Sequence, residues 1–166
     1  MEDKMKELPI FVRLLVSLED TERLHRRLQK ILAGRLDVDN YSVRKSPVHL
    51  TLCFHKDLPP AEYAEVVSRT YRPMQGQKVR LTVTGVAADH GCATYVAKRP
   101  EGIPVFPESK DCHLTMLLHK KQPVYSNALI KRLCDKGAHA GEVFEVLQTP
   151  LSVEATVDLV YSTRTR

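Results

Sequence analysis

Two segments that share a tripeptide decide the fold of this 166-residue chain: VHLTLCF at residues 48–54 and CHLTMLL at residues 112–118. In both, apolar side chains alternate with polar ones, which is the pattern of a β-strand that buries one of its faces. Each segment is followed after a short loop by a predicted helix, at residues 61–71 and 126–136. The sequence therefore predicts a strand–helix unit that occurs twice.

The polar face of each predicted strand carries a histidine and a threonine. His49 and Thr51 share one face, as do His113 and Thr115, because side chains at positions i and i+2 project from the same side of a strand. We expect Cys53 on the face of His49 as well. With seven histidines in the chain, chance gives roughly one His-x-Ser/Thr tripeptide, and one copy is best explained as a solvent-facing strand. Two matched copies favour a functional site.

These residue types suit acid–base chemistry on a phosphodiester. An imidazole has an ordinary pKa of ~6.5, so one histidine can be neutral and the other protonated near neutral pH. Threonine hydroxyls beside them can donate hydrogen bonds to phosphate oxygens. Such a reaction requires no metal and no cofactor. A zinc site built from His49, Cys53, Cys112 and His113 is disfavoured, because strand alternation points Cys112 away from His113.

The other segments predict an α+β fold in a single domain over residues 1–166. A tight turn at 89–91 separates predicted strands 79–88 and 92–97, which indicates a hairpin. No low-complexity linker divides the chain. The remaining predicted elements are a helix at 19–32, with Asp20 or Thr21 as its N-cap, and strands at 10–18, 143–148 and 151–160.

Composition and charge are those of a globular protein with a basic surface. The chain is 43% hydrophobic and 27% charged, which excludes a disordered tail or a collagen-like fibre. Its net charge of +5 and its pI of about 9.1 suit anionic partners such as RNA, and equally a merely basic surface. No apolar run reaches the ~18–20 residues of a membrane span, and no signal sequence follows Met1–Lys4. We therefore expect an intracellular protein without membrane association.

The paired His-x-Thr tripeptides resemble the hallmark of the two-histidine (2H) phosphoesterase superfamily. This resemblance implies a bilobal, pseudo-symmetric α+β fold, with two antiparallel sheets flanking a central groove and helices on the outside. Within the superfamily, the segment QPVYSN at residues 122–127 resembles a Lys-Pro-Val-x-Ser-Asn segment of the cyclic phosphodiesterase domain of fungal- and plant-type tRNA ligases. Gln122 stands where that segment has lysine.

That domain hydrolyses the 2′,3′-cyclic phosphate at an RNA end to a 3′-hydroxyl and a 2′-phosphate, as in tRNA splicing or RNA repair. Carried over to this chain, the resemblance implies that His49 and His113 are the acid–base pair. It also implies that Thr51 and Thr115 hold the phosphate. It leaves open which histidine is the acid. The implied partner is an RNA end, such as a tRNA exon, bound by a cytoplasmic or nuclear monomer.

Other interpretations of the same residues remain open. The chain has no P-loop and no nucleotidyltransferase lysine motif, so it is expected to be either a stand-alone relative or a domain excised from a protein with linked kinase and ligase domains. Another 2H reaction, such as 2′,5′-phosphodiester cleavage or RNA exonuclease trimming, would use the same four side chains. A non-catalytic RNA-binding module is the alternative from a different functional class, and it predicts salt-sensitive binding without turnover.

Overall fold

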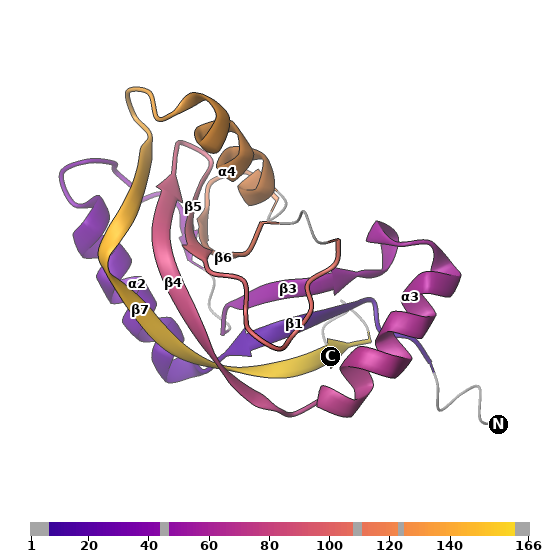
Figure 1. Cartoon of the computed structure of the whole chain (residues 1–166). Coiled ribbons are helices and arrows are strands. Elements are labelled where there is room, and N and C mark those ends of the chain that lie inside the picture. Colours follow the sequence, from indigo (N-terminus) through magenta and orange to yellow (C-terminus); the bar gives the residue numbers. More distant parts are fainter. Residues whose placement is uncertain (1–6, 44–46, 108–110, 123–124, 162–166) are drawn as a thin grey trace.

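Two long strands run through both halves of the molecule, which the computed structural model describes at residues 7–43, 47–107, 111–122 and 125–161 (Figure 1). These strands are β4 (Lys78–Ala88) and β7 (Val143–Val160), and they pair in antiparallel fashion. Figure 1 shows both ribbons curving from the upper half, beside α4, to the lower half, beside α3. They form the centre of a seven-stranded sheet of order β2-β6-β5-β4-β7-β1-β3.

The described residues form three α-helices and an antiparallel sheet, so the predicted α+β class is confirmed. None of these helices is both long enough and apolar enough to cross a membrane. Helix α3 continues as a π-helical turn over Val67–Tyr71 and a 3-10 turn over Arg72–Met74. The other elements are β1 (Phe11–Val16), α2 (Leu18–Leu32), β2 (Ser42–Val43), β3 (His49–Phe54), a 3-10 turn (His55–Asp57), α3 (Pro60–Val66), β5 (Cys92–Ala97), β6 (His113–Leu118) and α4 (Tyr125–Lys136).

The structure has one continuous sheet where the resemblance implied two. Residues 143–148 and 151–160 were predicted to be two separate strands. In the structure they are one strand, with a shift in register: Val83 of β4 pairs with Leu151, and Gly85 with Val146. A Cβ on Gly85 would lie 2.9 Å from the backbone oxygen of Glu145, so glycine permits the close approach beside the shift.

Strands β3 and β6 come into contact although they lie near opposite ends of the sheet order. Four strands separate them in that order, and in a flat sheet with strands ~4.8 Å apart they would be ~24 Å from each other. Their Cα atoms instead come within 8 Å. The sheet therefore curls strongly along β4 and β7 and brings its two end regions together.

Helix α2 helps to hold this curl, because it contacts both ends of the sheet. The Tyr95 hydroxyl on β5 donates a hydrogen bond of 2.7 Å to the backbone oxygen of Leu24. Thr21 Oγ1 accepts one of 3.2 Å from the backbone N–H of Val48, directly before β3. The helix is capped by Ser17, whose Oγ accepts from the Asp20 N–H, and neither predicted residue is its N-cap. The Thr21 hydroxyl instead joins α2 to the residue that precedes β3.

Candidate active site

The first motif lies on β3, with its side chains arranged largely as the sequence predicts. Leu50 and Leu52 are completely buried, whereas His49 and Thr51 are half-buried on the other face. The prediction for Cys53 is wrong: this side chain is buried next to Leu52 instead of lying beside His49 and Thr51. The register between β1 and β3 shifts between Val12 and Arg13, and this irregularity breaks the alternation along β3.

Strand β1 supplies the neighbours of the first motif. Arg13 is directly opposite Thr51 in the antiparallel pair, and Leu15 is opposite His49. Residues opposite each other project from the same face, with Cβ atoms about 4.5–5.5 Å apart. The ring of Phe11 lies beside the imidazole of His49, with 5.5 Å between the two centroids. An aromatic ring and a guanidinium thus flank the first histidine and threonine.

An ion pair holds this arginine in place. Arg13 Nε donates a hydrogen bond of 2.8 Å to Asp158 Oδ2 on β7, the strand on the other side of β1. The guanidinium carbon also lies 5.9 Å from the centroid of the Phe11 ring. The side chains of Arg13 and Asp158 remain 25% and 34% exposed, so the pair is accessible from solvent on the face that carries Thr51.

The second motif lies on β6 and repeats the pattern of the first. His113 and Thr115 are half-buried on either side of Leu114, which is completely buried. Their cross-strand neighbours on β5 are uncharged: Val96 is opposite His113, and Thr94 is opposite Thr115. The Thr94 hydroxyl is occupied by a hydrogen bond of 2.8 Å to the backbone oxygen of Leu114.

Helix α4 begins against Thr115. The hydroxyls of Thr115 and Ser126 lie 2.8 Å apart in a hydrogen bond, and Ser126 is completely buried. The Ser126 hydroxyl also lies 3.7 Å from Cys92 Sγ, and burial is the main cause that raises the pKa of this thiol to about 12. The first turn of α4 therefore contacts the face of β6 that carries Thr115.

A buried carboxylate accepts hydrogen bonds from two side chains of α4 and so fixes the start of this helix. Asp89 is completely buried in the turn between β4 and β5, and its Oδ1 accepts hydrogen bonds from the backbone N–H groups of Gly91 and Cys92. Its Oδ2 accepts a hydrogen bond of 2.6 Å from the Tyr125 hydroxyl and one of 3.4 Å from Arg132 Nη2. The position of Ser126, and through it that of Thr115, therefore depends on the β4–β5 turn.

The contact between β3 and β6 brings the two motif strands together, so the candidate site lies where the two ends of the curled sheet meet. Three cavities among the described residues lie elsewhere. One of about 840 Å³ is enclosed by α2, the segment after it and Leu117 of β6. Two of about 390 Å³ lie along the edge of β4, near Arg80. None of the three is lined by His49, Thr51, His113 or Thr115.

Other sequence expectations have mixed outcomes. Within the described part of the chain, no group of three or more His, Cys, Asp and Glu side chains is arranged to hold a metal ion. The disfavoured zinc set placed Cys53 beside His49, which the burial of Cys53 contradicts. Of the segment at 122–127, Pro123 and Val124 lie outside the described residues, and Ser126 and Asn127 belong to α4.

The sequence did not identify Arg13, Asp158 and Ser126 as site residues. Ser126 entered only as part of the segment at 122–127, and residues 10–18 were predicted as a strand with no functional side chain. A usable signal for Arg13 is its charge within the apolar run IFVRLLVSL, since a buried strand rarely holds an unpaired charge. Nothing in the local sequence pairs it with Asp158, which lies at the other end of the chain.

The chain matches no protein-family model, and no curated protein matches it significantly. Solved structures do match it, among them the crystal structure of the protein TT0787 of Thermus thermophilus. The identity to that protein is 13% and the TM-score 0.45, over 95% of this chain and 100% of the other. A similarity of this size assigns neither a family nor a function.

Proposed function

We propose that the protein is a 2H-type phosphoesterase that hydrolyses RNA 2′,3′-cyclic phosphate ends without a metal, leaving a 3′-hydroxyl and a 2′-phosphate. The observation that carries this proposal is the contact between β3 and β6. These two strands are distant in the sheet order, and each presents a half-buried histidine and threonine. Two imidazoles and two hydroxyls on adjoining strands are the groups that an in-line displacement at phosphorus requires.

In the proposed reaction, one imidazole takes a proton from water as the water oxygen bonds to phosphorus. The bond from phosphorus to O3′ breaks, and the second imidazole donates its proton to the departing O3′. Thr51 and Thr115 donate hydrogen bonds to the non-bridging oxygens, where negative charge increases in the transition state. The reaction consumes one water and leaves the phosphate on O2′.

The repeated architecture supports the superfamily part of the proposal. Strand β3 is followed by α3 and strand β6 by α4, so each motif begins a strand–helix unit. The paired strands β4 and β7 lie between the two units and join them into one sheet. An intracellular role in tRNA splicing or RNA repair, with the excess of positive charge facing RNA, belongs to the same proposal.

The test is to incubate the protein with EDTA and an RNA oligonucleotide that ends in a 2′,3′-cyclic phosphate, and to identify the terminal phosphate. We expect a 2′-phosphate that disappears with His113→Ala and persists with His90→Ala, a control at a histidine with 79% side-chain exposure. A 3′-phosphate would keep the two-histidine chemistry and reverse the leaving group. Salt-sensitive binding without turnover would support the RNA-binding module instead.

A further inference from the structure

The arginine beside the first motif has features of a ligand-binding residue. Arg13 and Thr51 are direct cross-strand neighbours on one face, so their Cβ atoms are about 4.5–5.5 Å apart. Within the described residues, the hydrogen bonding of the guanidinium runs through Nε alone, to Asp158. Its two terminal nitrogens donate to no side chain or backbone group of the described residues, and the side chain is half-buried on the motif face.

We infer that Arg13 is a phosphate-binding residue, and that its terminal nitrogens hold the phosphoryl group presented at Thr51. This inference rests on the proposed function. A planar guanidinium can donate two parallel hydrogen bonds to a phosphate, and such charge-assisted bonds are roughly twice as strong as neutral ones. Asp158 and the ring of Phe11 contact the side chain and orient it.

On the paired strand β5, no cation is opposite the second motif. The residues opposite His113 and Thr115 on β5 are Val96 and Thr94, and the hydroxyl facing Thr115 belongs to the buried Ser126. A dianionic product, such as a 2′-phosphate, is therefore held mainly at the first motif strand. The asymmetry gives the site one charged side, at β1 and β3, and one neutral side, at β5 and β6.

Binding of adenosine 2′-monophosphate, measured by calorimetry at one low ionic strength, tests this inference. Arg13→Gln should raise the Kd about 10- to 100-fold, the range for losing hydrogen bonds to a charged group. Asp158→Asn should lower the Kd about two- to fivefold, because it removes a half-exposed negative charge beside the ligand. The opposite directions are diagnostic, since a purely structural ion pair would make both substitutions act alike.

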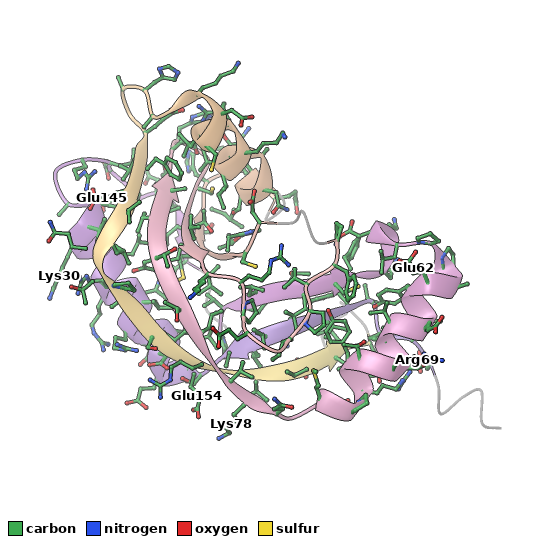
Figure 2. The ribbon with its side chains drawn as sticks, in the orientation of Figure 1. Lys30, Glu62, Arg69, Lys78, Glu145 and Glu154 are labelled. Carbon is green, nitrogen blue, oxygen red and sulfur yellow. The ribbon has the colours of Figure 1, made fainter. Side chains whose placement is uncertain are left out.

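Arg69→Gln is the matched control. Arg69 lies in the π-helical turn that continues α3, on its outer side (Figure 2), and forms an exposed ion pair with Glu65. The same substitution therefore breaks an arginine–carboxylate pair away from the site. Thermal melting of all three variants shows whether they fold. Arg13→Lys, which keeps the charge but loses the planar fork, should fall between wild type and Arg13→Gln.

The outcomes separate this inference from the proposed function. Hydrolysis of cyclic ends by the wild type, with equal Kd values for Arg13→Gln and Arg69→Gln, would overturn the role of Arg13 and leave the function standing. A wild type that binds the nucleotide through Arg13 without hydrolysing cyclic ends would contradict the function only. A wild type that does not bind adenosine 2′-monophosphate would overturn the inference.

Discussion

The two His-Leu-Thr strands present the same side chains in the same burial pattern, but their surroundings differ in charge. On β3 the motif faces an ion pair between Arg13 and Asp158 that is open to solvent. On β6 the motif faces uncharged residues, and Thr115 is bound to the buried hydroxyl of Ser126. The second motif is thus tied to a buried hydroxyl, whereas the first lies beside a partly exposed ion pair.

This difference shows that a repeated motif does not imply a repeated role. Two identical tripeptides can divide one reaction when their neighbours give one side a charge and the other side a fixed geometry. Under the proposed function, the β3 side binds the anion and the β6 side holds its threonine against the start of α4. The substitutions below test this division, beginning with the largest expected effect.

Replacing either histidine should nearly abolish turnover. Loss of a general acid or base typically costs ~10²–10⁴-fold in rate, so His49→Ala and His113→Ala should each reduce kcat by that amount. Both side chains are half-buried, and we expect little change in thermal stability. The assay is hydrolysis of a cyclic-phosphate RNA end, with melting curves for each variant. Near-normal activity of His49→Ala would contradict the shared mechanism.

Replacing each threonine should change the free energy of unfolding by different amounts in the two motifs. Thr115→Val removes the hydrogen-bond partner of a completely buried hydroxyl, and this should cost about 1–2 kcal/mol. No side-chain hydrogen bond of Thr51 is found within the described residues, so Thr51→Val should stay within about 0.5 kcal/mol of wild type. Urea unfolding measures both values. Equal destabilisation by the two substitutions would show that the hydrogen bond of Thr115 does not stabilise the fold more than the surroundings of Thr51 do.

A titration tests the ion pair between Arg132 on α4 and Glu142, which directly precedes β7. Arg132 Nη2 lies 2.6 Å from Glu142 Oε2, and this hydrogen bond is the main cause that lowers the pKa of Glu142 from about 4.5 to about 2. The folded pKa is depressed, so the pair stabilises the fold above pH 4.5, and this contribution disappears as the pH falls towards 2. NMR titration should show the low midpoint in wild type and a clear rise in Arg132→Gln. An unchanged midpoint would remove Arg132 as the cause.

Thiol reactivity gives the smallest effect and reports on the packing behind Thr115. Cys92 is completely buried with its pKa raised to about 12, whereas Cys134 is exposed on α4. Iodoacetamide at about pH 8 should therefore alkylate Cys134 first, with Cys92 protected. In Ser126→Ala, which removes a polar contact to the Cys92 thiol, the order should persist. Early modification of Cys92 in the wild type, located by peptide mass spectrometry, would contradict the packing of α4 on the second motif.

Local patterns were sufficient to predict the two motif strands. Alternation placed His49, Thr51, His113 and Thr115 on polar faces, because the two-residue period of a strand is a local property. Alternation failed at Cys53, where the register shift depends on the partner strand β1. A bulge of this kind arises from pairing and leaves no mark in the residues of one strand.

Properties that join distant segments could not be predicted. Residues 143–148 and 151–160 were predicted as two strands. In the structure they form one strand, because they pair with β4 on both sides of the register shift. The contact between β3 and β6 results from curvature summed over the whole sheet. The pair Arg13–Asp158 links residues from opposite ends of the chain, which only the tertiary fold brings together.

The central claim is that His49 and His113 belong to one site, and side-chain ¹⁵N NMR of the imidazoles tests it most directly. Adenosine 2′-monophosphate is titrated into the wild type, with His90 and His139 as exposed reference histidines. We expect the signals of His49 and His113 to shift together with a single Kd, while the reference signals stay constant. A shift of only one motif histidine, or shifts with two different Kd values, would contradict the shared site.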